Sequence, residues 1–252
     1  MKIIYNCIIV ILTIHIVVTP TFSQQSVIDS LRLIFVSENN SEKKIAIYNN
    51  IAHEVLEMNL EKAIPYADTL EHMATQYNSK IAKANALYLR GHVLHGRGDF
   101  MGAIRLYKQD LALHQQMNNL REMAQAYNDI GACFSELFQP DSTIIYYLKM
   151  AEINDQMGDF SGLASAYANI GNLYADQKTF DKAFEFLEKA LKIRLEHGEE
   201  KKTMYTYNNL STAYGMAGNY DKAIEYAHRE IIIGVHGFLF LTMFQSDFQG
   251  FF

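Results

Sequence analysis

The chain of 252 residues has no tryptophan and only three prolines. So few helix-breaking residues, together with many Ala, Leu, Glu and Lys residues, argue against a turn-rich β architecture and favour helices. Hydrophobic residues make up 49% of the chain and charged residues 20%, which excludes a disordered tract and supplies a sizeable core. The composition therefore predicts an all-α protein.

The chain also lacks an excess of basic residues, since 28 acidic residues stand against 22 basic ones. No basic surface for nucleic acid is therefore expected. Cysteine is scarce, because Cys7 lies in an apolar N-terminal run and Cys133 is the only other one. Removal of that run would leave a single thiol, which excludes an intramolecular disulfide. We expect Cys133 to be a small buried side chain rather than a reactive thiol.

Residues 1–23 have the layout of a secretory signal peptide. Lys2 precedes an uncharged apolar run over residues 3–18, and small residues before Gln24 fit cleavage between Ser23 and Gln24. An uncleaved membrane anchor is the alternative, but the run is shorter than the ~20 apolar residues that a spanning helix needs. The sequence therefore predicts an exported protein that is periplasmic or associated with the cell envelope.

A period of forty residues organises the rest of the chain. Residues 124–131 read Ala-Gln-Ala-Tyr-Asn-Asp-Ile-Gly, and residues 164–171 read Ala-Ser-Ala-Tyr-Ala-Asn-Ile-Gly. Two helices can cross closely only where one of them presents a small residue, and such residues recur at this period in both helices of most predicted pairs. They are Gly91, Gly131, Gly171 and Ser211 in the first helices, and Ala103, Ala183 and Ala223 in the second helices.

A second recurring set predicts where each pair ends. Asn or Gly follows the second helical run of each unit, and these residue types tolerate the left-handed conformation that ends a helix. The set consists of Asn78, Asn118, Gly158 and Gly198.

This pattern resembles the tetratricopeptide repeat family, and the unit containing Tyr167, Gly171, Tyr174, Ala183 and Leu187 matches it best. The resemblance implies a superhelical solenoid of stacked antiparallel helix pairs, whose concave face is lined mainly by the first helices. Ordinary units run about 34 residues. The longer period indicates a longer second helix, similar to the extracytoplasmic repeats of bacterial signalling and regulatory proteins.

The period divides the chain into segments. Residues 24–42 are expected to form a leading helix or N-terminal cap, residues 43–230 to form five repeats, and residues 231–252 to form an apolar tail out of register with them. The five predicted repeats are residues 43–82, 83–122, 123–162, 163–202 and 203–230.

Sequence motifs of catalysis are absent: there is no phosphate-binding glycine loop, paired-cysteine metal motif or nucleophile elbow. We therefore expect neither an enzyme nor a cofactor. His92 and His95 are three residues apart and could face one metal ion, but structural zinc takes four ligands and no further cluster supplies them. Two surface histidines are the preferred interpretation, with no metal site.

Polar residues lie beside the apolar stripe of the predicted first helices. If the family geometry holds, they face the groove, where side-chain amides can pair with an extended peptide backbone. The alternative is that they only solvate the array or cap neighbouring turns. The candidate ligand-binding residues are Asn85, His92, Gln125, Asn128, Asp129, Ser135, Asn169, Asn172, Asp176, Asn208, Asn209 and Thr212.

The end of the chain breaks the pattern. From Ile231 to Leu241 the charged face of the expected helix disappears. The tail could fold back over the last unit, contact a membrane or partner, or reflect an interrupted or truncated reading frame, which the abrupt break favours.

The sequence thus predicts an exported, non-catalytic module that binds a protein or peptide segment in its groove. The alternative is the sensor portion of a two-component histidine kinase or transcriptional regulator, in which case the transmitter would lie outside this chain. Neither hypothesis identifies the ligand.

Overall fold

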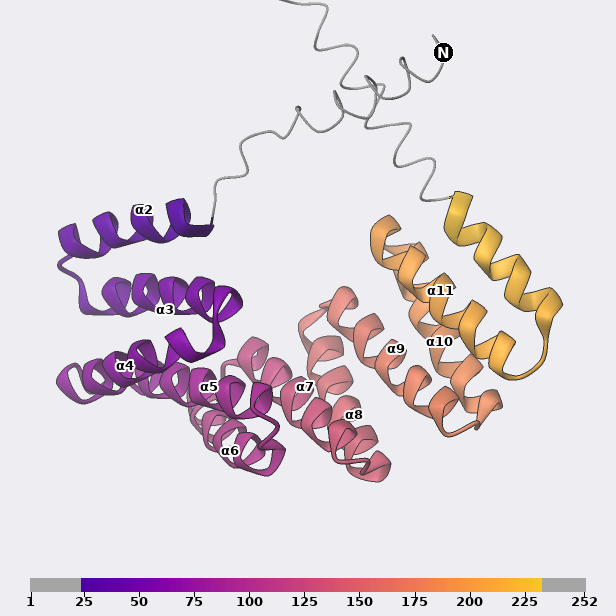
Figure 1. Ribbon diagram of the computed structural model, residues 1–252, viewed down its shortest axis with the longest axis horizontal. Helices are drawn as coiled ribbons and strands as arrows, with labels where there is room; N and C mark the ends of the chain where they lie inside the picture. Colours follow the sequence, from indigo (N-terminus) through magenta and orange to yellow (C-terminus); the bar gives the residue numbers. More distant parts are fainter. Residues whose placement is uncertain (1–23, 233–252) are drawn as a thin grey trace, which may run out of the picture. The chain divides into compact units, whose positions relative to one another are not determined.

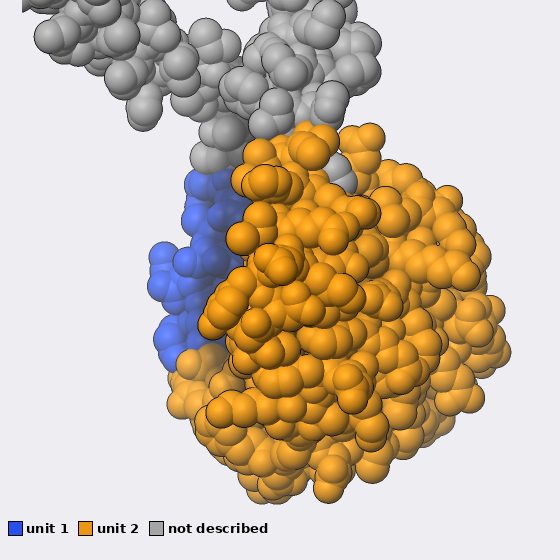
Figure 2. Space-filling model, turned by 90° about the vertical axis from the view of Figure 1, so that its right-hand side faces the viewer, with its two compact units in different colours: residues 1–93 blue, residues 94–252 orange. Residues whose placement is uncertain are grey.

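The computed structural model describes residues 24–232, which form helices joined by short turns, without a strand in that range. The chain divides into two compact units, residues 1–93 and residues 94–252, which Figure 2 colours separately. The prediction of an all-α protein is confirmed for the described part. The predicted signal peptide at 1–23 and most of the predicted tail, residues 233–252, lie outside the described residues.

Unit 1 begins with a helix that packs on a helix pair. Its core is formed by apolar side chains such as Ile45, Ala52, Leu70 and Leu89, all buried. Asn40 begins the second of these helices by accepting a hydrogen bond from the Lys43 backbone N–H. The elements are α2 (Gln24–Ser37), α3 (Ser41–Met58), η1 (Leu60–Ala63), α4 (Ile64–Gln76) and α5 (Lys80–Gly96), whose last three residues belong to unit 2.

Unit 2 is a succession of antiparallel helices in which neighbours along the chain lie side by side (Figure 1). Residues 220–232 form a last described helix. Helices α5, α7, α9 and α11 begin forty residues apart, each three residues before a predicted repeat bound. The further elements are α6 (Phe100–Met117), α7 (Leu120–Glu136), α8 (Pro140–Met157), α9 (Phe160–Asp176), α10 (Phe180–Glu196) and α11 (Glu200–Met216).

The extra length of each repeat is shared by both helices of a pair. Helices α7 and α9 have 17 residues each, while α8 has 18 and α10 has 17. The expectation of a longer second helix is therefore incomplete, because the first helix of each pair is as long or nearly as long. Each first helix begins before the predicted repeat bound because only one residue separates it from the left-handed residue that ends the preceding helix.

The left-handed ends of the second helices are confirmed. The backbone φ angles are +48° at Asn78, +52° at Asn118, +68° at Gly158 and +66° at Gly198. The turns inside the pairs use the same conformation at four further positions, two of which are not glycine. Those four are Gly98, Phe138, Lys178 and Gly218.

The small residues of the repeat lie where helices approach closely. A Cβ atom on Gly131 would come to 2.8 Å from the ring of Tyr147, and one on Gly171 to 2.7 Å from Cγ of Leu187. In the last pair, the hydroxyl of Ser211 donates a hydrogen bond to the backbone oxygen of Ala223 at 2.8 Å. Each crossing thus places a first helix directly against its second helix. Gly91, Ala103 and Ala183 are likewise buried.

Between residues 24 and 232, no helix combines the length and hydropathy that crossing a bilayer requires. The described helices at both ends expose apolar side chains, among them Leu33 and Val36 in α2 and Ile231 and Ile232 at the end of the last one.

Candidate functional site

The polar side chains of α7 form a network on one helical face. Asp129 is buried, and its Oδ1 accepts hydrogen bonds from Nε2 of Gln125 at 2.9 Å and from Nδ2 of Asn128 at 3.3 Å. Three of the predicted groove residues are thus engaged with one another. Ser135 lies further along the helix and is half-buried.

The equivalent face of α9 and α11 carries amides that are not engaged in this way. Asn169 and Asn209 stand at the repeat position of Asp129, and Asn172 lies one turn beyond Asn169. All three side chains are half-buried, and within residues 24–232 none has a hydrogen bond to the protein. We call Asn169, Asn172 and Asn209 the amide set. Their donors and acceptors are available to another molecule.

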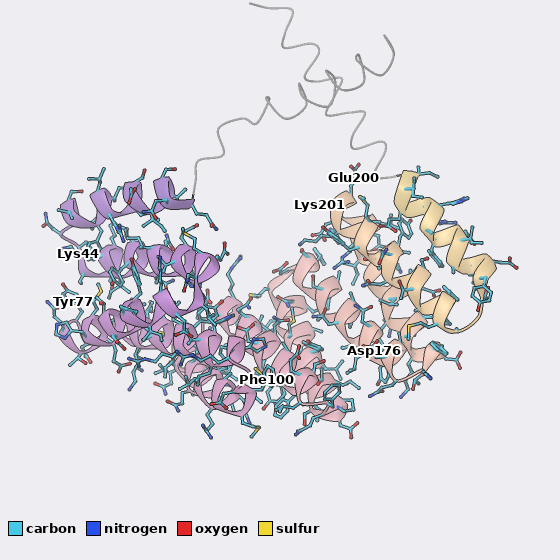
Figure 3. The ribbon with its side chains drawn as sticks, in the orientation of Figure 1. Lys44, Tyr77, Phe100, Asp176, Glu200 and Lys201 are labelled. Atoms are coloured by element: carbon cyan, nitrogen blue, oxygen red, sulfur yellow. The ribbon has the colours of Figure 1, made fainter. Side chains whose placement is uncertain are left out.

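Three further predicted residues surround the amide set. Asn208 donates from Nδ2 to Oε2 of Glu230 at 3.2 Å, which ties α11 to the last described helix. Thr212 is exposed on α11. Asp176 is exposed at the C-terminal end of α9, and Figure 3 shows it far from Glu200 at the start of α11.

Two predicted residues belong to α5 in unit 1. Asn85 is half-buried, and the imidazole of His92 lies 4.3 Å from the ring of Tyr88, measured between centroids. His95 packs edge-on against Phe100, with the ring centroids 5.3 Å apart. In the described part of the chain, no three His, Cys, Asp or Glu side chains converge on a point that could hold a metal ion.

Cys133 is fully buried next to the packing position Gly131. Burial raises the pKa of its thiol to about 12, and the neighbouring Asp129 carboxylate adds to this shift. The pKa of Tyr147 is raised to about 12 for the same two reasons. Neither group is poised as a nucleophile near neutral pH.

Several basic side chains of unit 2 lie on the second helices, above aromatic rings. Lys149 lies 5.3 Å above the ring of Tyr146, and Lys189 lies 4.9 Å above that of Phe186 and 2.6 Å from Glu185. These cation–π contacts and ion pairs hold the lysines on a solvated face. Lys149 and Lys189 thus lie on α8 and α10, whereas the amide set lies on α9 and α11.

Sequence reasoning missed one recurring position, near the end of the second helices. His114, Asn154 and Arg194 occupy it forty residues apart, and all three are buried. His114 pairs with the buried Asp110 at 3.2 Å, and desolvation raises the pKa of that carboxyl despite the imidazole. The identity of the residue changes from repeat to repeat, so no single-residue pattern revealed the position. The only feature of the sequence that could have revealed the position is that a polar residue recurs there every forty residues.

Arg194 shows how a buried polar side chain at this position finds hydrogen-bond partners. Its Nη1 donates to the backbone oxygen of Lys202 at 3.0 Å and to the hydroxyl of Thr206, and its Nη2 donates to the hydroxyl of Ser165 at 3.3 Å. Burial lowers the pKa of this guanidinium, while the charge of Glu199 opposes the shift. Arg194 therefore joins α9, α10 and α11.

Comparison with known proteins identifies the repeats. Residues 162–229 match the family model described as tetratricopeptide repeat. No curated protein matches the chain.

Solved structures share the fold over most of the chain. BtubC (BKLC) from P. vanneervenii superimposes with a TM-score of 0.70 at 20% identity, covering 85% of this chain and 89% of that one. A signal transduction ATPase with numerous domains and a tetratricopeptide repeat sensor, from Pyrococcus horikoshii, gives 0.70 at 19% identity, covering 83% and 33%. A Rap protein complexed with competence and sporulation factor gives 0.64 at 19% identity, covering 85% and 60%. At these identities the likeness establishes a helical solenoid fold.

Proposed function

We propose that the chain is a tetratricopeptide-repeat protein and that it acts as an exported, non-catalytic module, which holds a protein or peptide segment along the first helices of unit 2. The fold typically serves as a scaffold for protein binding. Export is proposed from the composition of residues 1–23, which has the layout of a secretory signal.

The observation that carries the proposal is the amide set. Asn169, Asn172 and Asn209 repeat on one face of successive first helices, and their side chains make no hydrogen bond within the described part of the chain. An amide offers both donors and acceptors, so it can pair with the N–H and C=O groups of an extended backbone regardless of sequence. A partner held in this way is recognised mainly through its main chain.

A pull-down from native cell envelope tests this proposal. The bait is the mature chain from Gln24, and the comparison is the triple variant in which Asn169, Asn172 and Asn209 are replaced by Ala. The matched control replaces Lys189 by Ala, an exposed residue held over the ring of Phe186. We expect a partner captured by the unmodified chain and by the control, but not by the triple variant. Equal capture by all three, with circular dichroism showing intact helices, would place binding on another face.

A second candidate function is the sensor portion of a signalling protein. The observation in its favour is the fold shared with the signal transduction ATPase, whose repeats are described as a sensor, and the chain spans only about a third of that protein. The notion that this chain belongs to a histidine kinase or transcriptional regulator is tested by the genomic reading frame. A frame continuing into a transmitter or DNA-binding module would support it, and a stop codon at the same place in related genomes would oppose it.

A further inference from the structure

A pocket of about 280 Å³ lies where the C-terminal end of α8 meets the starts of α7 and α9. Its size is at the small end for ligand pockets, which suits a group no larger than one side chain. It lies outside the amide set, near the opposite ends of the first helices from Asp176. The polar side chains that line it belong to Arg121, Glu122, Gln125, Asn154 and Asp159, and Gly162 contributes bare backbone.

Asn154 is the buried polar group of this pocket. Only 3% of the residue is exposed, and its Nδ2 has no hydrogen-bond partner among the described residues. The amide lies against the bare Cα of Gly162, where an added Cβ would come to 2.5 Å from Cγ of Asn154. Since no internal hydrogen bond fixes Nδ2, half a turn of the amide exchanges its nitrogen and oxygen. Asn154 can therefore present an acceptor to a molecule in the pocket.

The next repeat has a cationic side chain in this place. Forty residues on, the position of Asn154 is taken by Arg194, whose guanidinium fills the junction between α9, α10 and α11. The position of Gly162 is taken by Lys202, which reaches Ser161 with its ammonium group. The pocket thus lies where two cationic side chains of the following repeat are replaced by Asn and Gly.

A carboxylate is kept beside the pocket. Asp159 stands at the repeat position of Glu199, the carboxylate whose charge acts on Arg194. Its Oδ1 accepts from the Gly162 backbone N–H at 3.0 Å, and Oδ2 is its second acceptor. Glu122 adds another carboxylate, so the lining holds two carboxylates against the single cation of Arg121.

The remaining lining suits an aliphatic stem that ends in a planar cation. Gln125 donates from Nε2 to Asp129, so its carbonyl oxygen is the polar atom left for another partner. Met150 and Met157 supply apolar surface beside it. A guanidinium has five N–H donors in a fixed plane and no acceptor, which matches a site of carboxylate and amide oxygens.

We propose that the pocket between α7, α8 and α9 binds a guanidinium group in the manner of Arg194 in the next repeat. The group is either a free arginine-like solute or an arginine side chain of a bound segment. This site is distinct from the amide set and does not depend on the function proposed for it.

Isothermal titration calorimetry on the mature full chain tests the proposal with N-acetyl-arginine amide as the probe. N-acetyl-citrulline amide is the matched probe, because it has the same shape and carries an uncharged urea. We expect saturable binding of one arginine probe per chain and at least about tenfold weaker binding of the citrulline probe, since charge-assisted hydrogen bonds are lost. Equal affinities for the two probes, or no binding of either, would overturn the proposal.

Two variants locate the binding. Asn154→Arg supplies the chain's own guanidinium to the pocket, so the arginine probe should no longer bind while the melting temperature stays the same or rises. Glu122→Gln removes one carboxylate from a half-buried position and should lower the affinity for the arginine probe by about tenfold. This variant keeps the test decisive even if Asn154→Arg fails to fold. Glu185→Gln is the control, an exposed carboxylate on α10 that pairs with Lys189. Unchanged affinity in Glu122→Gln would contradict the assignment.

A third probe separates the two sources of the guanidinium. The peptide acetyl-Ser-Gly-Arg-Gly-Ser-amide presents the same group on an extended backbone. Affinity at least about tenfold above that of the arginine amide would assign the pocket to a bound segment. Equal affinities would assign it to a free solute. Loss of peptide binding in the triple variant of the amide set, with the arginine amide still bound, would show that the pocket holds the guanidinium by itself and that the amide set holds the backbone of the same segment.

Discussion

Leu187 packs directly on the bare Cα of Gly171, so that a Cβ there would come to 2.7 Å from its Cγ atom. Both residues are buried, and they join α9 to α10 at the closest approach of the pair. The equivalent contact one repeat earlier is between Gly131 and Tyr147. The partner thus changes from an aliphatic to an aromatic side chain while the glycine is kept, which indicates that the spacing of the two helices is the feature held constant.

Gly171→Leu should therefore destabilise the protein by roughly 1 to 3 kcal/mol, because the added side chain forces α9 and α10 apart. Thermal or urea unfolding followed by circular dichroism measures this change. Gly215→Ala is the matched control, since its added Cβ would meet no atom closer than 4.0 Å. Equal stability of Gly171→Leu and the unmodified chain would show that the crossing is looser than described.

Phe138→Gly should stabilise the protein. Phe138 has a φ of +54°, where a side chain other than glycine is strained, and its side chain is 92% exposed, so little packing is lost. We expect a gain of roughly 1 kcal/mol in the free energy of unfolding. Lys178→Gly, at φ +58° in the next repeat, should shift the unfolding midpoint in the same direction. A lower midpoint in both variants would contradict the strain argument.

Arg194→Met should weaken the junction of α9, α10 and α11. The substitution keeps much of the stem but removes the donors that reach the backbone oxygen of Lys202 and the hydroxyls of Thr206 and Ser165. The oxygen of Lys202 keeps the hydrogen bond that it accepts from the Thr206 hydroxyl at 3.2 Å. We expect a loss of about 2 to 4 kcal/mol in unfolding free energy. Arg229→Met, which breaks an exposed pair with Glu225, serves as the control and should change stability by less than about 1 kcal/mol. A loss no larger than that of the control would show that the buried guanidinium contributes no net stability.

Cys133 should resist alkylation in the folded protein. Its pKa of about 12 leaves almost no thiolate at pH 8, and its side chain is inaccessible. Peptide mass spectrometry after iodoacetamide treatment should find this residue modified only when urea unfolds the chain. Rapid modification without denaturant would mean that α7 opens readily.

The repeat could be predicted from the sequence because the close helix contacts and the helix ends each restrict the residue type at a single position. Only a small side chain fits at Gly171 and only a residue tolerant of positive φ suits Gly158, so both leave a visible period. Phe138 could not be predicted as a left-handed residue, because an aromatic side chain is unfavourable there and tertiary context overrides the preference. The same helical reasoning put Asn172 among the groove candidates but could not predict hydrogen bonds. The engagement of Asp129 by Gln125 depends on side-chain orientations that spacing does not specify.

The central claim is that a partner segment lies along the amide set, and site-specific photocrosslinking tests it most directly. A benzophenone amino acid is placed at Thr212, exposed on α11 one turn beyond Asn209, in one sample and at Lys192, exposed on α10, in another. Both replacements leave the amide set intact. After irradiation in native cell envelope, the account predicts a crosslinked partner from the Thr212 position and none from the Lys192 position. A crosslink from Lys192 alone would show that the partner binds the second helices and would contradict the account.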